Sequence, residues 1–235
     1  MIYCLSICAG KQSRFKCDTP KALMDIDGKT LIRRNYENAA PYIDKFLVVC
    51  SVENQLKFAT KNKIVISSGK GSGDAVWQAL SLLPLKQGDT CFILWGDCLQ
   101  EEDVFKKLKN SYTGVSLIPC VKEEKPYVQI IEDGNGVSVK FSKFNESISA
   151  GFHDLSVFYC DAVELLKQLN TFHDKIFHDG HYQHKHGNEM EFLDVFNDTD
   201  MSAKVLEFKN HKDFSFNTIE QFEQMLDDYK KEQTL

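Results

Sequence analysis

The 235-residue chain lacks several features that would place it in other protein classes. No apolar run approaches the roughly 20 residues that a membrane-spanning helix needs. No signal peptide is recognisable, so we expect a cytoplasmic protein that does not enter a membrane. The formal net charge is −6. A basic surplus, typical of proteins that bind the nucleic-acid backbone, is therefore missing, and we expect no nucleic-acid partner. A small polyanion held by a few local cations stays possible.

Cysteine is present, but the pattern of a disulfide or metal protein is not. None of the eight cysteines forms a C-x-x-C pair, and most lie inside apolar runs. This predicts reduced thiols, and no cysteine stands beside an obvious base that would make it a nucleophile. Linkers, repeats and low-complexity tracts are also absent, so residues 1–235 are expected to form one domain.

Short apolar segments alternate with segments of helical spacing along the first half of the chain. This alternation predicts an α/β fold, a Rossmann-like mixed, mostly parallel sheet with helices on both faces. The predicted strands are residues 1–8, 45–50, 63–66, 90–94 and 115–119, and the predicted helices are residues 29–40, 54–60, 74–83 and 101–110.

The pattern changes near residue 120. Strand-like segments and the hairpin signal Asn135-Gly136 predict a small β-rich insert over about 120–160. We expect it to form a smaller mixed sheet of its own, which would cover one edge of the main sheet and could build a homodimer interface. A helix is predicted over 161–169. A second helix, over 189–196, lies in a following segment of about 170–200, which the family resemblance described below makes the acceptor side. A strand over 203–208 and an amphipathic helix over 217–230 end the chain.

Positive charge concentrates in the loop after the first predicted strand, S6-I-C-A-G-K-Q-S-R-F-K-C-D-T-P-K21. Gly10 would let the backbone approach a ligand closely, and consecutive N–H groups can bind an anion. Lys11 and Arg14 could add charge-assisted bonds to phosphate oxygens. The spacing matches neither the Walker loop nor the dinucleotide fingerprint. From the charges alone, a solvated basic loop is an equal alternative.

The same loop resembles the signature of the nucleotidyltransferases that couple a nucleoside triphosphate to a phosphorylated sugar or alcohol. Their pattern is A-G-x-G-x-R-[ML], a short gap and P-K, and this chain has A9-G-K-Q-S-R-F15 and P20-K21. The departure is Gln12, where the family usually has glycine. Because glutamine carries a Cβ, we expect the loop to keep a right-handed conformation there or to be strained.

Other segments resemble the same family in the same order. G69-K-G-S-G-D-A-V-W-Q-A79 is similar to its glycine-rich segment against base and ribose, and W95-G-D97 to its Gly-Asp, whose carboxylate binds Mg²⁺. F216-N-T-I-E-Q-F222 resembles the late N-T-P-E-D, with Ile219 and Gln221 as departures. N188-E-M-E-F-L-D194 resembles the acceptor-side N-E-x-x-x-T-D. Together the matches run from residue 2 to about residue 225.

The resemblance implies a glycosyltransferase A-type nucleotide-diphospho-sugar transferase fold and a Mg²⁺-dependent reaction. An NMP would pass from an NTP to a phosphorylated sugar, polyol or amino-alcohol, with release of pyrophosphate. The compact length favours CMP, with UMP next. Alternatives are a molybdenum-cofactor-type guanylyltransferase, which Phe15 and the long gap to Lys21 disfavour, and a non-catalytic nucleotide-binding relative. A glycosyltransferase should show D-x-D after the fourth strand, where this chain has W95-G-D-C98.

The resemblance also assigns residues to roles. The predicted catalytic residues are Lys21, Arg14 and Lys11. The predicted nucleotide contacts are Ala9, Gly10, Lys11, Gln12, Ser13, Arg14, Ser68, Gly69, Gly73, Asp74, Ala75 and Asp97. The predicted metal ligands are Asp97 and Asn217, and the predicted acceptor contacts are His153, Asp154, Lys185 and Glu189.

Two of these roles also have a plainer reading. Asp97 ends a central strand, where ligands of open α/β sheets bind and where a carboxylate suits Mg²⁺. It could instead cap the helix predicted over 101–110, and Asn217 could cap the last helix. Four histidines crowd into H178-D-G-H-Y-Q-H-K-H186. A zinc site, acceptor recognition and an exposed polar loop are all open there.

Overall fold

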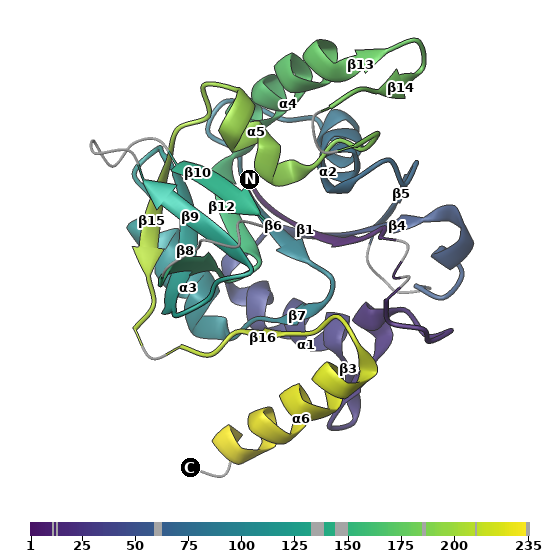
Figure 1. Ribbon diagram of the computed structural model, residues 1–235, viewed down its shortest axis with the longest axis vertical. Helices are drawn as coiled ribbons and strands as arrows, with labels where there is room; N and C mark the ends of the chain where they lie inside the picture. Colours follow the sequence, from purple (N-terminus) through teal and green to yellow (C-terminus); the bar gives the residue numbers. More distant parts are fainter. Residues whose placement is uncertain are drawn as a thin grey trace.

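One large sheet organises the chain, with strands in the order β10-β9-β11-β8-β12-β6-β1-β4-β5 and with β15 paired to β8. The computed structural model describes residues 1–10, 12, 14–58, 63–132, 139–143, 150–184, 187–209 and 211–233. Lys11, Ser13, Lys185 and the Asn135-Gly136 turn lie outside these ranges. Figure 1 shows the sheet crossing the middle of the molecule.

The central strands are parallel, as the alternating pattern predicts. β1 (Ile2–Cys8) lies between β4 (Lys45–Ser51) and β6 (Thr90–Trp95), and β5 (Lys63–Ser67) pairs in parallel with β4. The inner strands β1, β4 and β6 are largely buried on both faces and have the continuous apolar runs that a parallel sheet requires, whereas the edge strand β5 is partly exposed. Their carboxyl ends therefore meet along one edge.

Beyond β6 the sheet becomes mixed. β12 (Val157–Asp161) is antiparallel to β6 and to β8 (Ser116–Glu123), and β15 (Ala203–Glu207) is parallel to β8. The predicted α/β class with a mixed, largely parallel sheet is confirmed.

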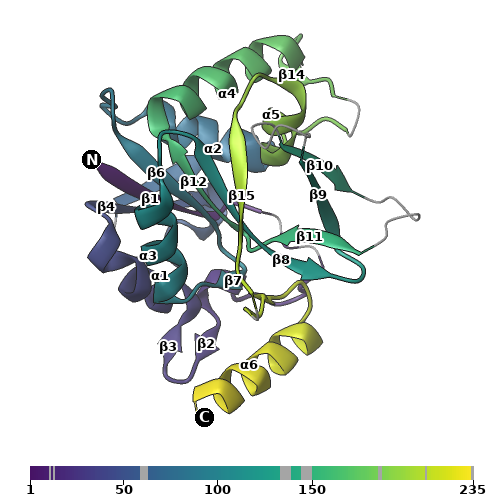
Figure 2. The same ribbon diagram turned by 90° about the vertical axis from the view of Figure 1, so that its left-hand side faces the viewer.

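The predicted insert does not form a separate sheet at the edge. β11 (Gly151–Asp154) pairs with β8, β9 (Val128–Glu132) pairs with β11, and β10 (Val139–Lys143) pairs with β9, all antiparallel. The reason is the length of β8, which runs past β12 and offers unpaired backbone groups that β11 satisfies. Figure 2 shows these strands continuing the sheet.

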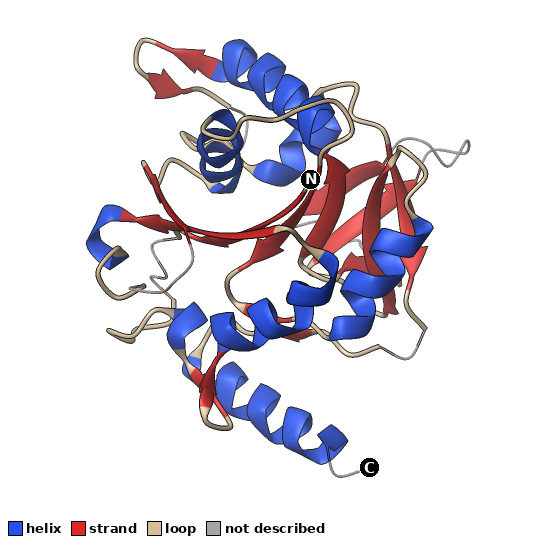
Figure 3. Ribbon diagram, turned by 180° about the vertical axis from the view of Figure 1, so that it is seen from behind, coloured by secondary structure: helices blue, strands red, loops and turns tan. Residues whose placement is uncertain are grey.

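Helices cover both faces, as predicted. α2 (Ser72–Ser81), α4 (Ala162–Ile176) and α5 (Phe192–Asp198) pack on the face of Tyr3, Leu5 and Ile7. On the opposite face, α1 (Leu31–Ala39) and α3 (Glu102–Ser111) pack on Cys4 and Cys8. The alternation of β1 side chains between the two cores follows from the period of two along a strand. Figure 3 shows α1 and α3 from behind.

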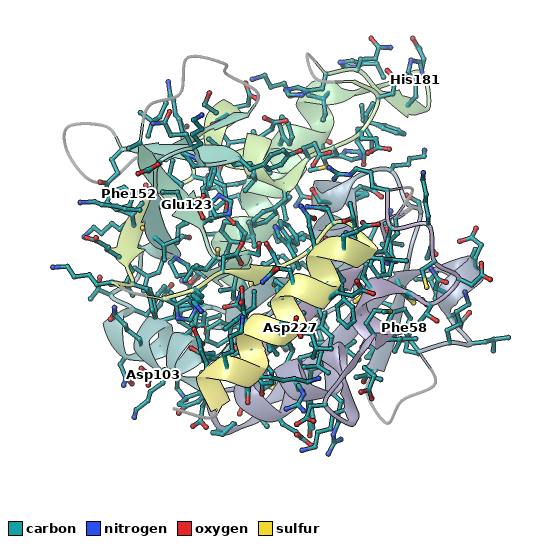
Figure 4. The ribbon with its side chains drawn as sticks, turned by 60° about the horizontal axis from the view of Figure 1, so that its bottom comes forward. Phe58, Asp103, Glu123, Phe152, His181 and Asp227 are labelled. Carbon is teal, nitrogen blue, oxygen red and sulfur yellow. The ribbon has the colours of Figure 1, made fainter. Side chains whose placement is uncertain are left out.

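A third, smaller core lies apart from the sheet, below it in Figure 1. It joins α6 (Ile219–Gln233) and β16 (Phe214–Ser215) to the segment around Phe15, Ile26 and Leu31. That segment contains the 3₁₀ turn Lys21–Leu23 and the short pair β2 (Asp25–Ile26) and β3 (Lys29–Thr30). β16 also pairs with β7 (Cys98–Leu99). Figure 4 shows α6 in front, with Asp227 on its exposed side.

Some elements differ from expectation. The helix expected over 54–60 is a 3₁₀ turn over Val52–Asn54 followed by turn residues to Phe58. α4 continues to Ile176, because Phe172 and Ile176 extend its buried stripe. A second 3₁₀ turn, Ala40–Tyr42, was not predicted. The hairpin of β13 (Phe177–His178) and β14 (His181–Tyr182) was not predicted either. Figure 4 places His181 at the outer end of this hairpin.

All eight cysteines lie in the described ranges and are free, and only Cys17 is exposed. Within those ranges, none of the helices has the length and apolar character to cross a membrane.

A buried carboxylate ties the β13–β14 hairpin to α2. Asp74 is 2% exposed, and it accepts hydrogen bonds from Ser68 Oγ, Gln78 Nε2 and Tyr182 Oη, the last at 2.6 Å. Tyr182 is itself 1% exposed, and burial, followed by the bond to Asp74, raises its pKa. The hydroxyl is therefore held as the donor in this bond.

We predict that Tyr182→Phe lowers the free energy of unfolding by about 1–3 kcal/mol, because it leaves a buried carboxylate short of one donor. Urea unfolding measures this. Tyr42→Phe is the matched control, since Tyr42 donates to Glu102 at an exposed site and its loss should cost at most about 0.5 kcal/mol. Equal effects of the two substitutions would contradict the structural role given to the Asp74 network.

Candidate active site

A cavity of about 680 Å³ opens where β1 and β6 end. This is the edge at which open α/β sheets bind ligands. Its walls come from the loop after β1, the glycine-rich segment before α2, the turn after β6, the β9–β10 region and the segment that starts α5. The lining residues used below are Ala9, Gly10, Gln12, Arg14, Lys21, Gly69, Gly71, Ala75, Trp95, Asp97, Tyr127, Phe141, Glu189, Glu191 and Asp194.

A second cavity of about 740 Å³ adjoins the first. Ala9, Gly10, Gln12 and Gly69 line both cavities. The second also has Ser67, Ser68 and the exposed Lys16 and Lys57 in its wall. The loop after β1 therefore stands between two spaces that share the edge of the sheet.

Lys21 is the centre of the first cavity's polar floor. Its Nζ lies 3.0 Å from Asp97 Oδ2, 3.0 Å from the Phe216 carbonyl oxygen and 3.3 Å from Asn217 Oδ1. The lysine is 6% exposed, so its ammonium depends on these three acceptors. The catalytic lysine and both metal ligands predicted from the sequence thus lie at one place.

Strand pairing brings these residues together across the sequence. β7 follows Asp97 directly and pairs with β16, and the Phe216 N–H donates to the Asp97 carbonyl at 3.2 Å. The Cβ position of Gly96 would lie 2.6 Å from Cys8 Sγ and 2.8 Å from the Ile7 carbonyl oxygen. A larger residue at position 96 would therefore push Asp97 away from the end of β1.

The plainer roles considered for Asp97 and Asn217 are not observed. α3 begins at Glu102 after Glu101, with no side-chain cap from Asp97. At α6, Thr218 Oγ1 accepts from the Gln221 N–H, and Gln221 Oε1 accepts from the N–H groups of Asn217 and Thr218. This reciprocal cap leaves the Asn217 side chain directed at Lys21. Gln221, a departure from the family pattern, fixes the Asn217 backbone.

Gln12 takes the strained of the two conformations expected for it. Its φ is +52°, in the left-handed region that favours glycine. Its Oε1 accepts the backbone N–H of Lys21 at 2.9 Å, and its carbonyl accepts the N–H of Phe15. The side chain that glycine lacks therefore ties the loop to the start of the Lys21 turn.

The oxygens around Lys21 suit a divalent cation. One carboxylate, one side-chain amide and one backbone carbonyl form a set of hard oxygen donors, the kind that Mg²⁺ prefers beside phosphates. Asp97, Asn217 and Phe216 therefore fit a magnesium site, but Lys21 Nζ lies among these oxygens. Groups of three or more His, Cys, Asp or Glu side chains able to hold a metal were not found in the described ranges.

The predicted nucleotide contacts divide in two. Ala9, Gly10, Gln12, Arg14, Gly69, Ala75 and Asp97 line the first cavity, and Ser68 lines the second. Gly73 and Asp74 line neither. A Cβ on Gly73 would lie 2.9 Å from the Met190 carbonyl oxygen, so this glycine serves helix packing, and Asp74 is held in its own network.

Three of the four predicted acceptor contacts lie in the described ranges: His153, Asp154 and Glu189. Among these three, only Glu189 lines the first cavity. Asp154 is 4% exposed and accepts the Ser156 N–H, and His153 Nε2 lies 3.6 Å from Asp213 Oδ2. The structure therefore does not bring this pair to the cavity, because β11 belongs to the main sheet and His153 faces Asp213, next to β16. Sequence reasoning missed Glu191 and Asp194, although both belong to the N188–D194 motif, and it missed Trp95, Tyr127 and Phe141.

Of the described histidines of the cluster, one packs into the fold. The His184 side chain is 7% exposed and lies between two carboxylates, with Nδ1 3.4 Å from Asp194 Oδ2 and Nε2 3.2 Å from Asp198 Oδ2. His178 and His181 are exposed on the hairpin. His184 therefore joins the segment after the hairpin to α5 and supports the wall that carries Asp194.

Comparison with known proteins decides the family. A profile of the MobA-like NTP transferase domain matches residues 4–169. The chain belongs to this family. It resembles the 2-C-methyl-D-erythritol 4-phosphate cytidylyltransferases of Petrotoga mobilis (27% identity over 150 residues, 60% of this chain) and Vibrio vulnificus (32% over 107 residues, 41% of this chain). These matches span 66% and 45% of the two relatives' own lengths.

Solved structures share the fold over nearly the whole chain. The inositol-1-phosphate CTP transferase of T. maritima has a TM-score of 0.72 at 14% identity, covering 97% of this chain and 96% of its own. The CTP:phosphocholine cytidylyltransferase LicC of Streptococcus pneumoniae has 0.69 at 16%, with coverage of 97% and 99%. HddC of Yersinia pseudotuberculosis, complexed with GMP-PN, has 0.68 at 16%, with coverage of 97% and 100%.

The His153–Asp213 pair predicts a specific pH dependence. Burial favours the neutral imidazole, but the facing carboxylates of Asp213, Asp154 and Glu123 outweigh it and raise the pKa of His153 to about 9. The stability from the charged imidazole is therefore complete below about pH 6.5 and is lost as the pH rises through about 9.

We predict that wild type is more stable than His153→Gln at pH 6 by an amount on the order of 2 kcal/mol, and that this difference largely disappears at pH 10. Urea unfolding of both proteins at pH 6, 7.5 and 10 gives the difference directly. His181→Gln, at an exposed histidine, is the control and should show no such trend. A wild-type advantage that grows with pH would show that His153 is neutral in the fold.

Proposed function

We propose that the protein is a nucleotidyltransferase that moves CMP from CTP to a phosphorylated alcohol and releases pyrophosphate. The observation that carries the proposal is the convergence of Lys21, Asp97 and Asn217 at the floor of the cavity. An ammonium, a carboxylate and an amide oxygen at the end of the central strands form a site for phosphates and their counter-ion.

The reaction needs little proton chemistry from the protein. The second pKa of a phosphate monoester is about 6, so the attacking oxygen is already ionised near neutral pH. The protein must hold two anions in line and neutralise the charge that builds up. Lys21 would contact the acceptor phosphate and the α-phosphate, and Arg14, exposed in the same cavity, would contact the departing pyrophosphate together with Lys11. When bound to Asp97 and Asn217, Mg²⁺ would neutralise phosphate charge.

The nucleoside would occupy the second cavity. The loop after β1 would then contact the phosphates, while Ser68 and Gly69 would contact the base and ribose. CTP is the favoured donor because the two sequence relatives and two of the three structural neighbours are named as CTP enzymes. UTP comes next, and the GMP-PN complex of HddC keeps GTP as the alternative. A non-catalytic role is less well supported, since Gln12 is accommodated and tied to Lys21.

The cavity walls favour an acceptor with a positive charge, which points to amino-alcohol phosphates rather than neutral sugars or polyols. Glu189, Glu191 and Asp194 line one wall, and the rings of Trp95, Tyr127 and Phe141 line the same space. Carboxylates beside aromatic faces suit an ammonium group. An acceptor cation in this space would lie against both the carboxylates and the rings.

We predict that CTP with Mg²⁺ raises the melting temperature of the wild type more than UTP, GTP, ATP or dTTP. A ligand at about 100 times its Kd adds roughly 2.7 kcal/mol of stability, which a thermal melt resolves. In Asp97→Ala the Mg²⁺-dependent part of the shift should be lost. Pyrophosphate release with CTP and a mixture of acceptors then tests turnover, and no shift with any triphosphate would contradict the proposal.

We predict that Glu191→Gln raises KM for phosphocholine by about tenfold and leaves KM for glycerol 3-phosphate or glucose 1-phosphate within about twofold. Glu191 Oε2 accepts from Ser72 Oγ at 2.8 Å, and glutamine keeps an oxygen for that bond while removing the charge. Glu223→Gln, on exposed α6, is the control. If the wild type turned over glycerol 3-phosphate or glucose 1-phosphate better than phosphocholine, the proposal of a positively charged acceptor would be contradicted.

A further inference from the structure

A side chain of the protein itself occupies the position among the Asp97, Asn217 and Phe216 oxygens that a metal ion would take. The Lys21 ammonium has three N–H donors, and the structure offers three acceptors at hydrogen-bond distance: Asp97 Oδ2, the Phe216 carbonyl and Asn217 Oδ1. Nζ also lies 5.9 Å from the ring centroids of Phe15 and Phe216. The ammonium is thus fully paired in a largely buried position.

A divalent cation and this ammonium cannot use the same oxygens together. Mg²⁺ binds oxygens at about 2.0–2.1 Å, so it would lie against the ammonium that now occupies the centre of the set. Two like charges a few Å apart repel strongly where solvent is limited. Lys21 side-chain exposure is 7%, so water offers little screening.

We propose that Lys21 is an exchangeable counter-ion that closes the metal site until a nucleotide arrives. This inference rests on the proposed function, since the triphosphate supplies the anion to which the lysine moves. The long unbranched stem of lysine allows that movement. Asp97 is 35% exposed on its side chain, so it remains reachable from the cavity when the ammonium leaves.

Two consequences follow for the free protein. It binds divalent cations weakly, because binding must first break three hydrogen bonds of a buried ammonium. The cation enters with the nucleotide, because the phosphates provide both new partners for Lys21 and further oxygens for the metal. Asp97 and Lys21 thus exchange partners, and neither is left buried and unpaired at any stage.

The test measures the affinity of the nucleotide-free protein for Mn²⁺. Electron paramagnetic resonance of the Mn²⁺ that stays free in solution gives this affinity. We expect Lys21→Met to bind Mn²⁺ at least about tenfold more tightly than wild type. Arg14→Met is the matched control, since it also removes one positive charge from the cavity, and it should change affinity by less than about threefold. Lys21→Met combined with Asp97→Asn should lose the gain.

The outcomes separate this inference from the proposed function. Wild type that binds Mn²⁺ without nucleotide as tightly as Lys21→Met overturns the exchange, and so does an equal gain in Arg14→Met. If either occurs while CTP still gives a Mg²⁺-dependent thermal shift in wild type, the exchange is wrong and the proposed function stands. If CTP gives no thermal shift although Lys21→Met gains Mn²⁺ affinity, the proposed function fails. The conclusion that Lys21 occupies a metal site in the free protein then still stands.

Discussion

The ion pair between Lys21 and Asp97 is the interaction on which the site depends. It joins a turn near the start of the chain to the end of the central strand β6, and Asn217 and the Phe216 carbonyl join the C-terminal segment to the same ammonium. Buried ion pairs contribute little net stability when their desolvation is counted, but they are costly to break from one side. Contacts to one ammonium therefore hold together three segments that are far apart in the sequence: the Lys21 turn, the end of β6 and the segment before α6.

The small third core gives this contact its rigidity. Phe15 and Phe216 pack on each other with ring centroids 5.6 Å apart, and Lys21 Nζ lies 5.9 Å from both centroids. Phe216 packs in turn on Phe222 of α6. α6 thus acts on the site from outside the main sheet. Its cap, formed by Thr218 and Gln221, orients the Asn217 backbone at the point where the segment enters the cavity.

Much of this arrangement could be predicted from the sequence. Apolar strand runs and the order of motifs gave the α/β class, and the position of Asp97 after a buried strand placed it at the ligand-binding edge. The prediction that the insert forms a sheet of its own was wrong, because no local pattern tells whether β11 continues the main sheet or starts another one. The sequence also could not show that His153 and Asp154 lie outside the cavity lining, since their direction depends on strand register. Tyr127 and Phe141 carry no local signal, because only the folded sheet brings them to the cavity beside Trp95.

The most direct test of the account is a crystal structure of the protein with Mg²⁺ and a CTP analogue whose α–β bridge cannot be cleaved. In that complex we expect that Lys21 Nζ has left the Asp97 oxygen for a phosphate, that the cation lies on Asp97 and Asn217, and that the pyrimidine lies against Ser68 and Gly69. A bound nucleotide with Lys21 still on its three oxygens would contradict it.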